Sequence, residues 1–124
     1  YGENILGLSN LIEGTLGEYQ YPSRFFDVIS AYDVIEHVPD LNLFLTEIKR
    51  ILKPHGIVDI GTPDIDHWRV PKNLPTWNEF KPSEHLYYFS KDTLGKLLEK
   101  NNLKIVKRRF SLKPGLKVVI SHAI

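Results

Sequence analysis

The chain has 124 residues, of which 42% are hydrophobic and 25% are charged, and its formal net charge is +1. These values are ordinary for one globular domain and argue against a disordered chain. Because the sequence contains no cysteine, a disulfide framework, a thiolate nucleophile and a zinc ribbon are excluded, so carboxylates, histidines and backbone groups must carry any chemistry.

Two apolar stretches in the first part of the chain predict strands of a buried sheet. Residues 8–13 form the first stretch, which Gly14 closes, and residues 26–31 form the second. Neither stretch alternates cleanly between apolar and polar residues. Near-continuous apolar runs are typical of parallel strands that are covered on both faces, so we expect a parallel sheet inside the domain.

A helix is predicted after these strands, with Pro39 in its first turn and Asp40 near its positive end. Its apolar stripe consists of residues at helical spacing: Leu41, Phe44, Leu45, Ile48, Ile51 and Leu52. The tripeptide Pro54-His55-Gly56 predicts the end of the helix, before an apolar strand at residues 57–61. Strand, helix and strand together predict a right-handed parallel crossover, with ligands at the carboxyl ends of its strands.

Residues 62–83 contain four prolines and two tryptophans, which predicts an ordered loop or lid. A short helix within residues 64–70 is compatible with this segment. Ser90 is then expected to cap a second helix, with Phe89 and Leu94 as its hydrophobic staple. After a left-handed turn at Asn101-Asn102, residues 103–110 and 116–123 predict two antiparallel strands.

The charges are divided unevenly along the chain. Residues 1–66 hold 4 basic and 11 acidic side chains, and residues 67–124 hold 12 basic and 4 acidic ones, so the two parts carry −7 and +8. The basic carboxyl-terminal stretch has few aromatic residues for stacking, so nucleic-acid binding is not expected. No apolar run of membrane-spanning length and no signal segment is seen, which predicts a cytoplasmic protein without a membrane span.

Three stretches resemble motifs of one family, in the same order and at the same separations. They are Phe26-Asp27-Val28-Ile29 with the following Asp33-Val34-Ile35-Glu36-His37-Val38-Pro39-Asp40, then residues 48–56, and then Glu84-His85-Leu86-Tyr87-Tyr88-Phe89-Ser90. They are similar to motifs of class I S-adenosylmethionine-dependent methyltransferases, nearest the branch of ubiquinone-biosynthesis O-methyltransferases. The resemblance covers residues from about 10 to about 110.

This resemblance implies an α/β fold with a Rossmann-like sheet. In that family seven strands lie in the order 3-2-1-4-5-7-6, and this chain would supply strands 3 to 7, mostly parallel with an antiparallel carboxyl-terminal hairpin. Residues 1–124 would then form a single partial methyltransferase domain that lacks the glycine-rich amino-terminal segment. The start at Tyr1 and the absence of methionine fit a fragment or a processed product.

The resemblance also implies a site for S-adenosylmethionine. By motif position, Thr15 and Leu16 would lie near the adenine, and Ala31, Tyr32 and Asp33 near the methionine portion. The catalytic candidates are Asp33, His37 and His85, with the two histidines near the methyl acceptor.

Asp33, Glu36 and His37 place two carboxylates and an imidazole within five residues at the end of a buried strand. One interpretation is a general base, His37, that deprotonates an acceptor hydroxyl. Another is a divalent cation such as Mg²⁺, held by these three residues, which would lower the pKa of that hydroxyl. A third is structural, with Glu36 and His37 capping the following helix. For His85, a functional and a structural role both stay open.

The sequence therefore predicts methyl transfer from S-adenosylmethionine to a small molecule, with oxygen as the expected acceptor atom. It leaves open whether this chain is itself an enzyme. The alternative is a non-catalytic half-domain that folds or forms a homo-oligomer, because a strand with an unpaired edge can pair with another chain.

Overall fold

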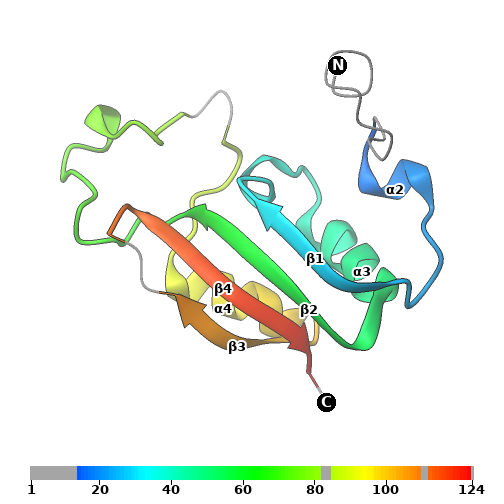
Figure 1. Ribbon diagram of the computed structural model, residues 1–124. Helices are drawn as coiled ribbons and strands as arrows, with labels where there is room; N and C mark the ends of the chain where they lie inside the picture. The colour runs from blue at the N-terminus through cyan, green and yellow to red at the C-terminus, as the bar shows by residue number, and fades with distance from the viewer. Residues whose placement is uncertain (1–13, 82–84, 110–111, 124) are drawn as a thin grey trace, which may run out of the picture.

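The computed structural model describes residues 14–81, 85–109 and 112–123, which form one α/β unit (Figure 1). The sheet contains four strands in the order β1-β2-β4-β3. These strands are β1 (Phe26–Tyr32), β2 (Leu52–Pro63), β3 (Leu103–Arg109) and β4 (Gly115–His122). The strand predicted at residues 8–13 lies outside the described residues.

The pairing of the strands confirms the predicted Rossmann-like topology. β1 and β2 are parallel, and Ala31 lies opposite Ile60. β4 lies antiparallel between β2 and β3, so β1, β2 and β3 all run in the same direction (Figure 1). The parallel crossover and the antiparallel carboxyl-terminal hairpin are therefore present as predicted.

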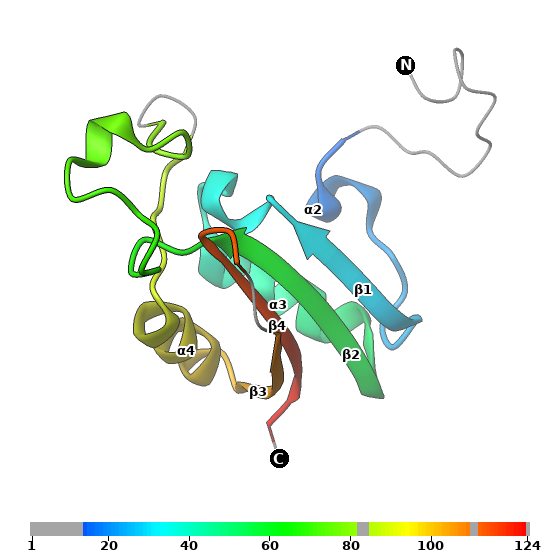
Figure 2. The same ribbon diagram turned by 60° about the vertical axis from the view of Figure 1, so that its left-hand side comes forward.

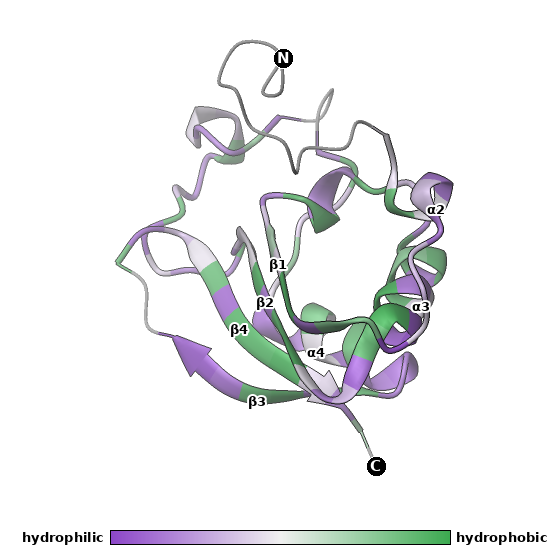
Figure 3. Ribbon diagram, turned by 45° about the vertical axis from the view of Figure 1, so that its right-hand side comes forward, coloured by the Kyte–Doolittle hydropathy of each residue, from purple (hydrophilic) through white to green (hydrophobic). Residues whose placement is uncertain are grey.

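The hydrophobic core lies between the sheet and two helices, α3 (Leu41–Ile51) and α4 (Lys91–Lys100). Both helices cover the same face of the sheet (Figure 2). Val58 and Ile60 of β2 are fully buried on this face, in one cluster with Leu45 and Leu98. Figure 3 shows hydrophobic residues along the middle strands β2 and β4, and hydrophilic residues in the second half of β3. On the opposite face Val28 is 55% exposed.

Local capping chemistry fixes where the helices begin. The Asp40 carboxylate accepts a hydrogen bond of 3.0 Å from the Leu43 amide and is the N-cap of α3, so Pro39 precedes the helix instead of lying in its first turn. At α4, Ser90 and Thr93 form a reciprocal capping box. After α4, Asn102 adopts the left-handed conformation with φ 57°, as predicted for this turn. Within the described part of the chain, no helix has the length and hydropathy to cross a membrane.

One sequence expectation about segment boundaries is wrong. α3 ends at Ile51 and β2 starts at Leu52, so Pro54-His55-Gly56 lies inside the strand. The pairing shifts here, because Phe26 lies opposite Leu52 whereas Val28 lies opposite Ile57, and proline is tolerated where a ladder is interrupted. The segment predicted as a loop or lid has turns within residues 64–70, where a short helix had been left possible, and one 3-10 helix at Leu74–Thr76.

Candidate functional site

The candidate site lies where the parallel strands β1 and β2 end. The Asp33 amide donates a hydrogen bond of 2.8 Å to the Gly61 carbonyl, which ties the two strand ends together. Asp33 itself has φ 55°, a left-handed conformation that aspartate adopts more readily than most residues. This turn leads directly into a 3-10 helix at Ile35–His37. The residues that follow β1 therefore lie at the carboxyl end of the sheet, beside the end of β2.

Glu36 is buried in this turn, with 1% of its surface exposed. Its Oε1 accepts a hydrogen bond of 2.8 Å from the Thr62 hydroxyl at the end of β2. Its backbone carbonyl accepts hydrogen bonds from the amides of Leu86 (2.7 Å) and Tyr87 (3.3 Å). Glu36 thus joins three segments that lie far apart in the sequence.

His37 and His85 lie together beside Glu36, and their ring centroids are 4.7 Å apart in an edge-to-face arrangement. The His37 side chain is 41% exposed, and its Nε2 lies 3.7 Å from Glu36 Oε2. His85 is buried, and its Nε2 lies 3.9 Å from the Glu79 carboxylate. The interpretation of Glu36 and His37 as helix caps is wrong, because Asp40 provides the side-chain cap of α3.

Two pockets meet at Asp33. One, of about 610 Å³, lies between the β1–α3 turn and the short helix α2 (Leu16–Tyr19), and we call it the α2 pocket. Its lining includes Thr15, Leu16, Tyr19, Tyr21, Asp33 and His37. The other, of about 750 Å³, has Asp33, Thr62, Glu79 and Arg109 in its lining. Ala31, which is buried, and Tyr32, which lines the second pocket, do not line the α2 pocket.

Tyr32 lies on the face of the sheet opposite the helices. Its hydroxyl donates a hydrogen bond to the Asp59 carboxylate, which raises the pKa of the phenol. Arg109 of β3 approaches the same carboxylate to 3.4 Å. The three side chains therefore form a polar connection across the sheet, from β1 through β2 to β3.

Sequence reasoning placed ligands at the carboxyl ends of the parallel strands, but it did not find that the Thr62 hydroxyl donates a hydrogen bond to Glu36 at that edge. It also missed Tyr19 and Tyr21, which line the α2 pocket with their rings 4.3 Å apart. Two aromatic residues so close to Thr15 and Leu16 were the available signal, because they follow the predicted adenine-side residues directly.

Comparison with known proteins places this geometry in a family. The model of a methyltransferase domain matches residues 10–108, which is most of the chain. The chain belongs to this methyltransferase family. The match covers the turn with Glu36 and His37, the lid and the first strand of the hairpin.

The chain is similar to ubiquinone biosynthesis O-methyltransferases of several bacteria. The one from Paramagnetospirillum magneticum is 33% identical over an aligned length of 79, and the match covers 51% of this chain and 31% of that protein. The one from Rickettsia canadensis is 31% identical over an aligned length of 100, and the match covers 68% of this chain and 41% of that protein. The chain therefore spans about a third of the length of these relatives.

Solved structures show the same fold. Mitomycin 7-O-methyltransferase superposes with a TM-score of 0.76 at 20% identity, over 98% of this chain and 37% of that chain. The 1,6-didemethyltoxoflavin-N1-methyltransferase of Burkholderia thailandensis superposes with a TM-score of 0.70 at 19% identity, over 91% of this chain and 50% of that chain. That structure contains S-adenosylhomocysteine and 1,6-didemethyltoxoflavin. At this level of identity the likeness shows the fold alone.

The residues around the α2 pocket fit part of the cofactor that this methyltransferase fold implies. A volume of about 610 Å³ is in the range of small-molecule sites. Tyr19 and Tyr21 offer aromatic faces to a purine, and Thr15 and Asp33 offer polar groups for its attached sugar or amino acid. Three of the predicted cofactor residues, Thr15, Leu16 and Asp33, line this pocket.

The described residues do not fit a magnesium site. The group that could hold a cation consists of Glu36, His37 and His85, with ligand atoms within 4.8 Å of one another, and Asp33 is outside it. This set offers one carboxylate and two imidazoles, whereas Mg²⁺ prefers oxygen ligands in octahedral geometry. Imidazole-rich sets suit transition metals instead. The prediction that Asp33, Glu36 and His37 together hold Mg²⁺ is therefore not supported.

Proposed function

We propose that this chain takes part in S-adenosylmethionine-dependent methyl transfer to a hydroxyl group of a small molecule, as part of a methyltransferase domain. The observation that carries the proposal is the α2 pocket, where Thr15, Leu16 and Asp33 meet the side chain of His37. The family match supports methyl transfer, and the names of the relatives support oxygen as the acceptor atom.

Bound S-adenosylmethionine would supply an electrophilic methyl group on a sulfonium sulfur. The task of the chain is then to position the acceptor and to remove its proton. We assign His37 as the general base, because it lines the α2 pocket and is accessible. The Glu36 carboxylate, 3.7 Å from His37 Nε2, stabilises the positive charge that the imidazole gains when it takes the proton.

His85 is assigned to the acceptor side. Its ring packs edge-on against His37, and Glu79, which lies near its Nε2, lines the second pocket. This arrangement supports an acceptor that enters from the 750 Å³ pocket and reaches His37 beside Asp33. Proton transfer to His37 needs no metal ion. This agrees with the composition of the residues that could hold one, Glu36, His37 and His85, which offer few oxygen ligands.

The second candidate is a non-catalytic domain that self-associates. It is supported by the position of β1, which is an edge strand among the described strands and carries the exposed Val28. An exposed edge presents backbone donors and acceptors to another chain. In this case a second copy of the chain would pair with β1.

The test is an isothermal calorimetric titration of the chain with S-adenosylhomocysteine, which needs no knowledge of the acceptor. Micromolar binding that is weakened by substitution of Thr15 or Asp33 supports the methyltransferase proposal. Absence of binding at millimolar ligand contradicts it for this chain and favours the non-catalytic alternative.

A further inference from the structure

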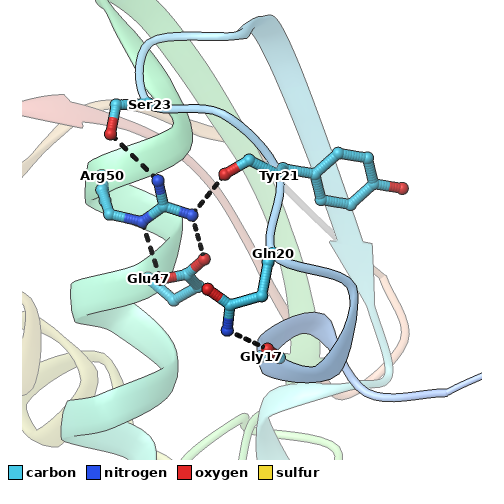
Figure 4. A network of polar contacts seen from close by, with 6 residues as sticks. All are labelled: Gly17, Gln20, Tyr21, Ser23, Glu47 and Arg50. Atoms are coloured by element: carbon cyan, nitrogen blue, oxygen red, sulfur yellow. Dashed lines mark hydrogen bonds and ion pairs between the residues drawn. The ribbon is translucent and has the colours of Figure 1, made fainter.

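One side chain fastens the segment between α2 and β1 to the body of the domain. The Arg50 guanidinium, near the end of α3, donates a hydrogen bond of 2.9 Å to the Ser23 hydroxyl and a second to the Tyr21 carbonyl. It also donates hydrogen bonds to both oxygens of the Glu47 carboxylate, which lies one turn earlier on α3. Figure 4 shows these contacts converging on the guanidinium from both sides.

The backbone reinforces this attachment at the start of β1. The Arg24 amide donates a hydrogen bond of 2.9 Å to the Arg50 carbonyl, and the Phe25 amide donates one of 2.8 Å to the Ile51 carbonyl. Residues 21–25 are therefore fixed against the last turn of α3 by both main-chain and side-chain bonds.

The last residue of α2 and the segment after it form an aromatic wall of the α2 pocket. Tyr19 and Tyr21 line the pocket. The Tyr21 ring packs edge to face against the Phe26 ring, and their centroids are 4.8 Å apart. α2 fully buries none of its residues; its Leu16 packs against the hydrophobic core, but Tyr19 is 50% exposed, so the packing of α2 does not by itself fix the tyrosine rings. The wall is thus placed mainly by the segment that follows it, where Arg50 holds the carbonyl of Tyr21 itself.

We propose that Arg50 is a positioning residue that holds the Tyr19–Tyr21 wall so that it can receive the planar ring of an adenosine-containing ligand. The inference rests on the proposed function and adds a residue to it that lies outside the pocket, since Arg50 does not line the α2 pocket. The planar guanidinium is suited to this task because its donors have a fixed fork geometry, which can hold Glu47 and the Tyr21 carbonyl at once. A lysine ammonium lacks this fork.

The test compares Arg50→Gln and Arg50→Lys with the wild-type chain and with a control, Lys53→Gln. Lys53 is a good match because it is a nearby cation whose ion pair with Asp27 is exposed and does not involve the α2 segment. Hydrogen exchange is followed for the amides of residues 15–25, and the affinity for S-adenosylhomocysteine is measured by calorimetry. If Arg50→Gln does not fold, Arg50→Lys and Ser23→Ala, which remove fewer contacts, carry the test.

In Arg50→Gln we expect exchange of these amides to become about 10-fold faster and the affinity for S-adenosylhomocysteine to fall about 10-fold. Arg50→Lys should recover part of both effects, and Lys53→Gln should behave as wild type. Unchanged exchange overturns the positioning role, whether or not the ligand binds. Faster exchange with unchanged affinity overturns the link to the ligand. If the wild-type chain does not bind S-adenosylhomocysteine, the proposed function fails, while the exchange measurement still decides the positioning role.

Discussion

The rings of His37 and His85 lie edge to face with their centroids 4.7 Å apart, although His37 follows β1 and His85 follows the predicted lid of residues 62–83. The buried carboxylate of Glu36 lies 3.7 Å from His37 Nε2, and the Glu79 carboxylate lies 3.9 Å from His85 Nε2. A histidine pair between two carboxylates and next to two pockets is well suited to proton transfer.

Replacing His37 with glutamine should lower the rate of methyl transfer by about 10²–10⁴-fold, because a general base contributes about that factor. The effect should fall on kcat, with little change in the affinity for S-adenosylhomocysteine. The measurement is release of S-adenosylhomocysteine in the presence of a panel of phenols and catechols. His55→Gln is the control, since His55 is an exposed residue that lines neither pocket of the site. Equal rates for His37→Gln and His55→Gln would remove His37 from the mechanism.

Two substitutions of Glu36 should distinguish the contribution of its hydrogen bond to stability from the contribution of its charge. Glu36→Ala removes the acceptor of the Thr62 hydroxyl and leaves a cavity, so we expect it to lower the free energy of unfolding by about 2–3 kcal/mol. Glu36→Gln keeps an oxygen for Thr62 and removes a buried charge, and should lower it by less than about 1 kcal/mol. Urea denaturation measures both values.

Glu36→Gln also tests whether the charge of Glu36 contributes to activity. In Glu36→Gln the fold is retained, but the carboxylate beside His37 is lost, so the rate of methyl transfer should fall while the midpoint of unfolding stays near that of wild type. If Glu36→Gln destabilises the chain as much as Glu36→Ala, the charge of the side chain and not its hydrogen bond with Thr62 stabilises this turn, contrary to this account.

The Arg50–Glu47 pair should make the stability of the chain depend on pH in the acidic range. The hydrogen bond from Arg50 lowers the pKa of Glu47 below its ordinary value of 4.5. Because the pKa is lower in the folded state, the stabilisation is present above about pH 4.5 and is lost as the pH falls through the lowered value.

This acid sensitivity can be measured as the difference in unfolding free energy between the wild-type chain and Glu47→Gln. The difference should shrink as the pH is lowered from about 6 to about 3. Glu99→Gln, which changes an exposed carboxylate of α4, serves as the control and should show no comparable trend. A difference that is constant with pH would show that the ionised pair does not contribute.

If the second candidate function holds, the position of β1 at the edge of the described strands predicts concentration-dependent dimers of this chain, which size-exclusion chromatography with light scattering can detect. Val28→Lys places a charge on the exposed face of this strand and should shift the chain to a monomer, because charges on edge strands oppose pairing. Leu43→Lys makes the same change at a residue of α3 that is 67% exposed and should leave the dimer intact. A wild-type monomer at high concentration would contradict self-association.

The sequence by itself determined that α3 and α4 form, that Ser90 caps α4, and the class of the fold. The apolar stripe of α3, the aspartate at its start and the Ser90 cap of α4 act over a few neighbouring residues, so their spacing in the sequence is sufficient to predict them. The same holds for the antiparallel hairpin around Pro114 and for the family, whose motifs are short and ordered along the chain.

Tertiary structure decided which residues of the site come together. Asp33 and His37 were expected near one another from their spacing, but only the path of the lid brings His85 against His37. Thr62 reaches Glu36 only because β1 and β2 are parallel and end at the same edge. The start of β2 at Leu52 depends in the same way on pairing with Phe26, which overrides the local preference of proline and glycine for a turn. Contacts between distant segments depend on packing and strand register, and local spacing carries no information about either.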